Sequence, residues 1–167
     1  KLCDLGLDVI IGGHPHVVEP MDLLTSTVDP EHTAVCIYSL GNAVSNQRRE
    51  EMASRPEGYT EDGALFTVTF QKDSNGTVRV ADTSVIPTWV NKFVNQNGKV
   101  EYNILPLEQD SQAQWMARFG VNETVYESLL ESYQRTMGIV GPGLEKCRNY
   151  LTQNGLSREQ ANILPAA

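Results

Sequence analysis

Apolar positions form short runs along the first hundred residues, and their spacing predicts a strand-rich region. Residues 8–13 and 33–40 are almost uninterrupted apolar runs, typical of strands covered on both faces in a layered α/β protein. Residues 64–72 alternate between apolar and polar positions, which predicts a strand with one buried face. That face comprises Ala64, Phe66, Val68 and Phe70.

Two Asn-Gly pairs predict hairpins in the same region. Asn75-Gly76 and Asn97-Gly98 each lie between two strand-like stretches. Both residue types tolerate the positive φ that a tight hairpin turn needs. Pro87 and Pro106 are predicted to mark strand ends, because proline has no backbone N–H for a sheet.

Helical periodicity begins near residue 108. Residues 108–120 predict a helix that ends at Gly120. An amphipathic helix follows, with Asn122 as its N-cap and Gly138 as its end. Its apolar stripe comprises Tyr126, Leu129, Leu130, Tyr133 and Met137.

The remainder of the chain predicts shorter helical pieces. Gly141-Pro142-Gly143 predicts a break, residues 144–155 a short helix, and Ser157–Gln160 a final capped turn. Residues 108–167 therefore form a helical segment that either packs on the sheet or stands apart as an interaction module. The pattern favours neither alternative.

Composition and charge narrow the function classes. The net charge is −8 and the pI is about 4.8, and no cluster of Lys and Arg offers a surface for nucleic acid. No apolar run approaches the roughly 20 residues of a membrane-spanning helix. The cysteines, Cys3, Cys36 and Cys147, are too dispersed for a disulfide framework or a zinc knuckle. Cys36 is predicted to be a small buried hydrophobic residue.

The first residues indicate that the chain is part of a longer protein. Leu2, Leu5 and Leu7 resemble the tail of a helix that stops at Gly6, and a core strand follows at once. We therefore expect this chain to be the C-terminal piece of a larger protein, with any targeting segment upstream.

Two histidines, His14 and His16, flank Pro15 directly after the first predicted strand. A residue before proline favours extended geometry, and alternate residues of an extended stretch point to the same side. Both imidazoles are therefore predicted to face one direction, as ligands for zinc, manganese or iron. The preceding Gly13 lets the backbone bend sharply or approach a ligand. The alternative is that both histidines are polar residues of a turn.

A second polar stretch, Ser39-Leu40-Gly41-Asn42, follows the second apolar run. Asn42 either orients a ligand through its amide or bonds its own backbone in an ordinary turn. Together with Gly13, Ser39 and Asn42 are candidates for contact with a substrate or with the metal ligands. Ser39 lacks the Gly-x-Ser-x-Gly setting of a hydrolase nucleophile.

Two histidines do not complete a catalytic metal site, which commonly has three protein ligands. His32 is predicted to be a surface histidine. The polar segment 47–63 is interpreted as a mobile loop over the site or a disordered connection, and Arg48 and Arg49 as solvated charges or anion contacts. Local candidates for further metal ligands are Asp4, Asp8, Glu19, Asp22 and Asn42.

These stretches together resemble a known family. "GLDVIIGGHPHVVEP", "YSLGNAVSNQ", "DGALFTVTF" and "VIPTWVNKF" occur in this order within residues 3–107. They are similar to the C-terminal region of the poly-γ-glutamate capsule biosynthesis (CapA) family. The chain departs from the family at Ala43, where a bulky aromatic residue is frequent, and at Glu19, where glutamine is common. Residues 108–167 carry no motif of the family.

The resemblance implies an α+β, layered fold. Residues 1–107 would form part of a calcineurin-like metallophosphoesterase αββα sandwich with mixed sheets, and residues 108–167 a helical tail. The Gly-His-x-His motif of that superfamily matches residues 13–16, which implies that His14 and His16 are ligands of a two-metal centre of divalent ions. The other ligands of the superfamily would lie upstream of Lys1. The chain alone is therefore expected to bind metal weakly or not at all and to be inactive.

The resemblance also implies a role in making or exporting an anionic polyglutamate capsule. An anionic polymer or a phosphate ester would be the substrate, and the capsule synthesis machinery the partner. The location would be outside the cytoplasmic membrane, at the cell surface or anchored through the upstream part. Three alternatives stay open: a metal-dependent hydrolase or transferase, a non-catalytic surface scaffold of the same fold, and a generic metallophosphatase.

Overall fold

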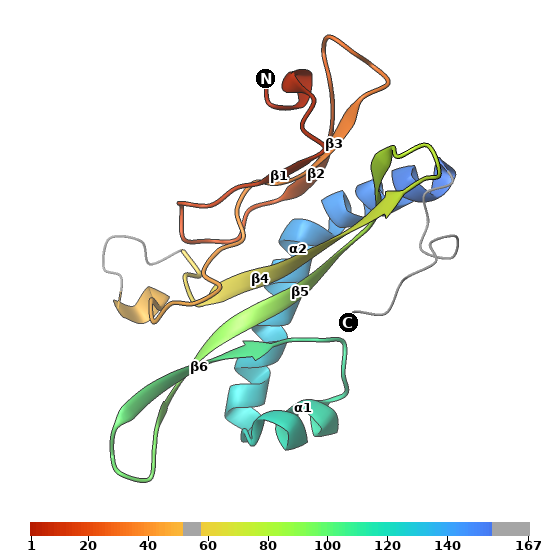
Figure 1. The fold of residues 1–167 in the computed structure, drawn as a ribbon. Coiled ribbons are helices and arrows are strands. Elements are labelled where there is room, and N and C mark those ends of the chain that lie inside the picture. The colour runs from red at the N-terminus through yellow and green to blue at the C-terminus, as the bar shows by residue number, and fades with distance from the viewer. Residues whose placement is uncertain (52–57, 155–167) are drawn as a thin grey trace.

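The computed structural model describes residues 1–51 and 58–154 of the 167-residue chain. Its strands form two three-stranded sheets (Figure 1). The first sheet has the order β1-β3-β2, with β1 at Val9–Ile11, β2 at Met21–Thr25 and β3 at Thr33–Ile37. β1 runs parallel to β3, and β2 runs antiparallel to it. Both apolar runs are confirmed as strands, whereas the mixed polarity of β2 did not predict a strand.

The second sheet is antiparallel, with the order β4-β5-β6. β4 spans Asp62–Lys72, β5 Val78–Val94 and β6 Val100–Pro106. The two predicted Asn-Gly hairpins are confirmed, with Gly76 at φ 89° and Gly98 at φ 74°. β6 ends at Pro106, as predicted.

The prediction that Pro87 ends a strand is wrong, because β5 runs unbroken through it. Pro87 lies opposite Ala64, whose N–H donates away from β5 to the Leu40 carbonyl at 2.9 Å. The Pro87 carbonyl also points away from β4 and accepts from Leu107 N–H at 2.8 Å. The two residues thus form a non-hydrogen-bonded pair, in which the missing N–H of proline removes no β4–β5 bond.

Phe70 does not share the buried face predicted for β4. The register of β4 and β5 shifts between Thr69 and Phe70, and such a bulge reverses the alternation of side chains beyond it. Ala64 is buried, Phe66 and Val68 are half-buried, and Phe70 is 55% exposed.

The start of the second predicted helix and the end of the first are confirmed, but the first helix begins four residues later than predicted, after the N-cap Ser111. α1 spans Gln112–Phe119 and ends at Gly120, which adopts φ 63°. α2 spans Glu123–Gln153, and its N-cap Asn122 accepts a hydrogen bond from Val125 N–H at 3.0 Å.

The predicted end at Gly138 and break at residues 141–143 are wrong, because α2 continues through them for 31 residues in all. Pro142 lies on the exposed face. A Cβ at Gly143 would lie 1.9 Å from the Met21 carbonyl oxygen, so this glycine permits close packing on β2 rather than a break. The buried stripe runs on without interruption and comprises Leu129, Ser132, Thr136, Val140, Gly143, Leu144, Cys147 and Leu151. The turn predicted at residues 157–160 lies outside the described residues.

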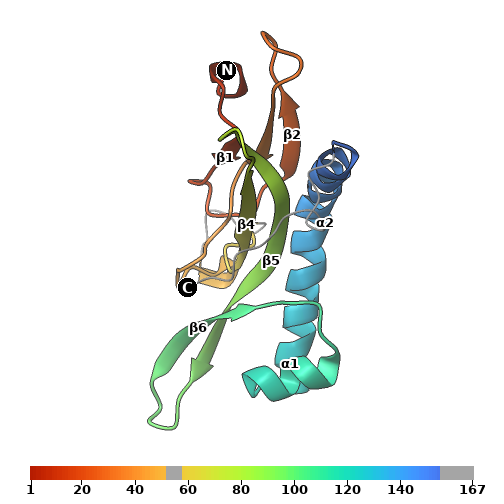
Figure 2. The same cartoon turned by 45° about the vertical axis from the view of Figure 1, so that its right-hand side comes forward.

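Helix α2 joins the two sheets, since it lies along β2 and β5 (Figures 1 and 2). Its C-terminal half shares one hydrophobic core with both sheets; the core includes Met21, Val35, Ile37, Val80, Val140, Leu144, Cys147 and Leu151. A second core joins α1, α2 and the β5–β6 hairpin around Trp89, Leu105, Leu107, Trp115 and Leu129. The helical segment therefore packs on the sheets, and the α+β class is confirmed. None of the described helices is both long and apolar enough to span a membrane.

All three cysteines are buried free thiols, and Cys36, at 1% exposure, is the buried residue predicted. Burial raises the pKa of the Cys147 thiol to about 11, so it stays protonated at neutral pH.

A buried ion pair attaches α2 to the start of β4. The Asp62 carboxylate is 3% exposed and accepts hydrogen bonds from Arg135 Nε at 2.7 Å and Nη2 at 2.9 Å. Ser132 Oγ donates to the same carboxylate at 2.7 Å. Burial raises the pKa of Asp62, while the guanidinium and the hydroxyl oppose that rise by stabilising the carboxylate.

Replacing Gly143 tests the close packing of α2 on β2. Gly143→Ala should lower the free energy of unfolding by about 1–3 kcal/mol, because its Cβ would overlap the Met21 carbonyl. Gly138→Ala is the matched control: a Cβ there meets nothing within 4 Å. It should raise stability by roughly 0.5–1 kcal/mol through helix propensity. Urea unfolding of both variants measures the difference, and shifts of equal sign would contradict it.

Replacing Arg135 tests the buried ion pair. Arg135→Gln should lower the free energy of unfolding by about 3–5 kcal/mol, because it leaves the Asp62 carboxylate buried without its cation. Arg118→Gln removes the exposed pairs with Glu108 and Asp110 and should leave the urea midpoint close to that of the wild type. Similar midpoints for both variants would show that the Asp62 pair does not anchor α2.

Candidate metal-binding site

His14 and His16 lie in the loop that follows β1, and backbone contacts at Gly12 constrain where this loop begins. Gly12 N–H donates to the Ile37 carbonyl at 2.8 Å. A Cβ at Gly12 would lie 2.0 Å from the Tyr38 carbonyl oxygen, so only glycine fits this crossing. The loop therefore starts from a fixed point beside the end of β3.

The extended geometry predicted for the His-Pro-His stretch is wrong. His14 adopts φ 102° and His16 φ 60°, both in the left-handed region that few residues other than glycine adopt. The reason is topological: β1 runs parallel to β3, but Val18 pairs antiparallel with Leu40, just beyond β3. The chain must reverse direction between Ile11 and Val18, and the histidines lie in that reversal. Both side chains are exposed.

The structure brings two predicted site residues, His16 and Asn42, into contact. His16 Nδ1 lies 2.8 Å from Asn42 Oδ1. Asn42 Nδ2 donates to the Thr60 carbonyl at 2.8 Å and lies 3.3 Å from the His16 carbonyl and 3.2 Å from Gln47 Oε1. Asn42 is 7% exposed, so a buried amide supports an exposed imidazole. The alternative that Asn42 bonds its own backbone does not hold.

Two glycines position Asn42. Gly41 adopts φ 68°, and a Cβ there would lie 2.6 Å from the Asp62 carbonyl oxygen. A Cβ at Gly63 would lie 2.5 Å from the Asn42 carbonyl oxygen. Gly41 and Gly63 are paired as an antiparallel bridge, so the loop after β3 lies directly on the start of β4. This approach places the Asn42 amide beside Thr60.

The other predicted residues have different surroundings. Gly13 is exposed, and a Cβ there would meet nothing within 4 Å. Ser39 is fully buried, and its Oγ accepts from Gly41 N–H at 3.2 Å. Ser39 therefore stabilises the turn that carries Asn42.

Two of the additional ligand candidates are occupied by other partners. Asp4 Oδ1 accepts from Thr27 N–H at 2.6 Å, and that bond is the largest contribution to an Asp4 pKa of about 2. Asp22 Oδ1 pairs with Lys146 Nζ at 2.6 Å. Asp8 is exposed and Glu19 half-buried. Within residues 1–51 and 58–154, no three His, Cys, Asp or Glu side chains are grouped closely enough to hold a metal ion.

The described parts of the polar segment 47–63 are solvated only in part: Arg49 and Glu50 are exposed, whereas Arg48 is not the solvated charge predicted. Arg48 is 14% exposed; it bonds Glu50 and the Val90 carbonyl and stacks on the Trp89 ring at 5.0 Å. Thr60, Glu61 and Asp62 are all buried. Thr60 contributes to the site through its backbone carbonyl, which leaves no signal in the sequence. Arg49 is the more exposed arginine, at 42%, and pairs with Glu61 at 3.4 Å.

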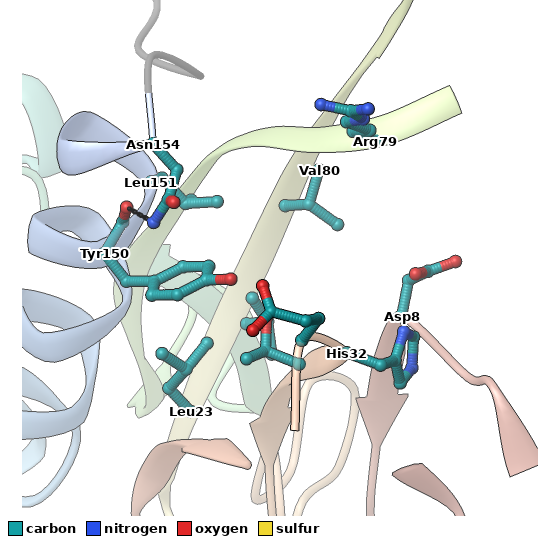
Figure 3. A pocket seen from close by; sticks show the side chains of 11 residues that line it. Asp8, Leu23, His32, Arg79, Val80, Tyr150, Leu151 and Asn154 are labelled. Carbon is teal, nitrogen blue, oxygen red and sulfur yellow. Dashed lines mark hydrogen bonds between the residues drawn. The ribbon is translucent and has the colours of Figure 1, made fainter. Parts of the chain in front are cut away.

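A hollow of about 440 Å³ lies elsewhere, between the C-terminal end of α2 and the first sheet (Figure 3). Its lining includes Asp8, His32, Arg79 and Tyr150, but neither His14 nor His16. His32 Nε2 lies 3.3 Å from the Leu7 carbonyl oxygen. This hollow is therefore separate from the candidate metal ligands.

The rings of His14 and His16 differ in their hydrogen bonding. His14 forms no hydrogen bond to any described residue, and His16 uses only Nδ1, so both rings keep a nitrogen for a ligand. The residues present thus fit part of a metal site, and further ligands would have to come from outside the described residues.

Comparison with known proteins shows which family these motifs resemble. Residues 1–47, which include His14, His16 and Asn42, match the family model described as "Bacterial capsule synthesis protein PGA_cap". The PGA biosynthesis protein CapA of Bacillus subtilis (strain 168) is 29% identical over 121 residues, which cover 71% of this chain and 27% of that relative. The chain thus spans about a quarter of the length of that relative. No solved structure matches this chain significantly. The resemblance to the CapA family is therefore confirmed, and residues 1–47 carry the match to bacterial capsule synthesis proteins.

Proposed function

We propose that this chain takes part in the biosynthesis or export of a capsule, as part of a metal-dependent phosphoesterase or hydrolase. The observation that carries the proposal is the contact between His16 and Asn42 at 2.8 Å. It joins an exposed imidazole to a buried amide within the residues that match the capsule synthesis family. A metal-binding histidine commonly uses one ring nitrogen for the metal and the other for such a partner.

The first sheet is proposed to be part of an αββα sandwich. Parallel strands usually have both faces of their sheet covered, and β1 and β3 are parallel. α2 covers one face, and an apolar pocket lined by Ile10, Leu24, Cys36 and Tyr38 lies against the sheet as well. In the sandwich, further residues of the full protein would cover this surface.

Divalent metals bound at this loop would clamp a phosphate or polarise the bond to be cleaved and activate a water molecule. His14 and His16 would be metal ligands, and Asn42 would orient the His16 ring through its hydrogen bond. Because the described residues supply only two ligands, we expect the complete centre to need groups from the rest of the protein. The substrate would be an anionic polymer or a phosphate ester, handled at the cell surface together with the capsule synthesis machinery.

A non-catalytic scaffold of the same fold is the second candidate. The net charge of −8 disfavours direct binding of an anionic polymer without a metal, so such a scaffold would bind or organise the capsule machinery instead.

Metal content of the full-length protein tests the proposal. Purified wild-type protein should retain divalent metal after dialysis, as measured by elemental analysis. His14→Ala and His16→Ala should each weaken metal affinity at least tenfold, because each removes a ligand. His32→Ala is the matched control and should bind like the wild type, since His32 lies in the separate hollow. Wild-type protein without metal would favour the scaffold, and unchanged affinity in both ligand variants would refute the site.

The isolated chain should behave differently from the full-length protein. Residues 1–167 alone should bind Zn²⁺ or Mn²⁺ only weakly in calorimetry and should not hydrolyse a generic phosphate ester, because a site with two ligands is incomplete. Strong turnover by this chain, lost on His14→Ala, would overturn that expectation.

A further inference from the structure

We propose that Asn42 is a positioning residue that selects one tautomer of His16, with the proton on Nδ1 and the lone pair on Nε2. Nε2 would then be the atom that binds a metal. The statement about the metal rests on the proposed function, whereas the statement about the tautomer does not.

The orientation of the Asn42 amide follows from its neighbours. One end of the amide lies 2.8 Å from the Thr60 carbonyl oxygen and 3.3 Å from the His16 carbonyl oxygen. A carbonyl oxygen only accepts hydrogen bonds, so this end must be the NH₂ group. Gln47 Oε1 lies 3.2 Å from the same nitrogen, whose two N–H bonds are shared among these three oxygens. Turning the amide over would place its oxygen against two carbonyl oxygens in a buried site.

The amide orientation determines the histidine tautomer. Asn42 Oδ1 is left facing His16 Nδ1 at 2.8 Å, and this oxygen can only accept. Nδ1 must therefore carry the proton, and in a neutral ring Nε2 then holds the lone pair. No described residue hydrogen-bonds Nε2, and the His16 side chain is exposed, so the lone pair is open to a ligand.

The surroundings make this preference rigid. Asn42 is 7% exposed, and its backbone N–H donates to the Asp62 carbonyl at 3.3 Å. Gly41 and Gly63 allow the two backbones to lie in close contact. A low-dielectric setting strengthens the bond to His16. Aspartate at this position would keep the acceptor for His16 but present a second oxygen to the Thr60 carbonyl, which explains why an amide suits the site.

The tautomer can be measured directly in metal-free full-length protein. Long-range ¹H–¹⁵N spectra of ¹⁵N-histidine-labelled protein at pH about 8, above the ordinary histidine pKa of about 6.5, distinguish a protonated from an unprotonated ring nitrogen. We expect His16, identified by the loss of its signals in His16→Gln, to show Nδ1 protonated and Nε2 unprotonated. An Nε2-protonated ring in the wild type would refute the proposal whether or not the protein binds metal.

Substitutions at Asn42 separate positioning from folding. Asn42→Ala should shift His16 towards the Nε2-protonated form and weaken Zn²⁺ affinity by about 10–100-fold. Asn42→Asp retains the acceptor oxygen and should keep His16 Nδ1 protonated. Both Asn42→Ala and Asn42→Asp lose the hydrogen bond to the Thr60 carbonyl. A merely structural role of Asn42 would therefore change the histidine spectra of the two variants alike. Asn103→Ala, at an exposed position of β6, should match the wild type in both measurements.

The outcomes for the tautomer and for the metal are distinguishable. If His16 carries the predicted proton but the wild-type protein binds no Zn²⁺, the proposed function fails and the tautomer assignment stands. If Asn42→Ala keeps both the Nδ1-protonated ring and wild-type Zn²⁺ affinity, the positioning role of Asn42 is refuted.

Discussion

The packing of the buried tetrapeptide Thr60–Gly63 against the loop after β3, the Arg49 segment, β5 and α2 is the constraint on which the rest of the structure depends. The carbonyl of Asp62 accepts from Asn42 N–H, and the close contact at Gly63 leaves no room for a side chain. The loop after β3 is thereby held against the start of β4, and the first sheet is joined to the second. Each of its residues has a partner outside the tetrapeptide: Thr60 contacts Asn42, Glu61 contacts Arg49, Asp62 contacts Arg135, and Gly63 contacts the Asn42 backbone.

The same segment connects the helical part of the chain to the candidate site. Arg135 reaches Asp62 from α2 and also lies 3.6 Å from the centre of the Tyr59 ring, while Arg49 lies over that ring at 4.5 Å. A buried ion pair contributes little net stability when complete, but losing one partner leaves an uncompensated charge in the core. Such a pair favours one placement of α2 over others. The helical segment therefore belongs to the scaffold that positions Asn42.

The candidate site combines a buried amide with an exposed imidazole. Asn42 is buried and His16 is exposed, so the support is rigid while the proposed ligand atom faces outward. Asp4 and Asp22, two of the carboxylates considered as further ligands, already have partners within the fold. The incomplete set of ligands agrees with the comparison, in which this chain covers 27% of the CapA relative. Within the described residues Asn42 contacts His16, whereas a complete metal centre would need further groups.

The sequence by itself determined most strands, both hairpins and the helix caps, because these depend on local alternation, Asn-Gly turns and the capping side chain of Asn122. It also identified His16 and Asn42 as candidates, but not their contact. Only the tertiary structure decided the features that depend on pairing between distant segments. These are the reversal that places both histidines at positive φ, the passage of β5 through Pro87, and the continuation of α2 past Gly143. In each case the deciding partner is the backbone of a segment distant in sequence, and no local pattern records what that neighbour will be.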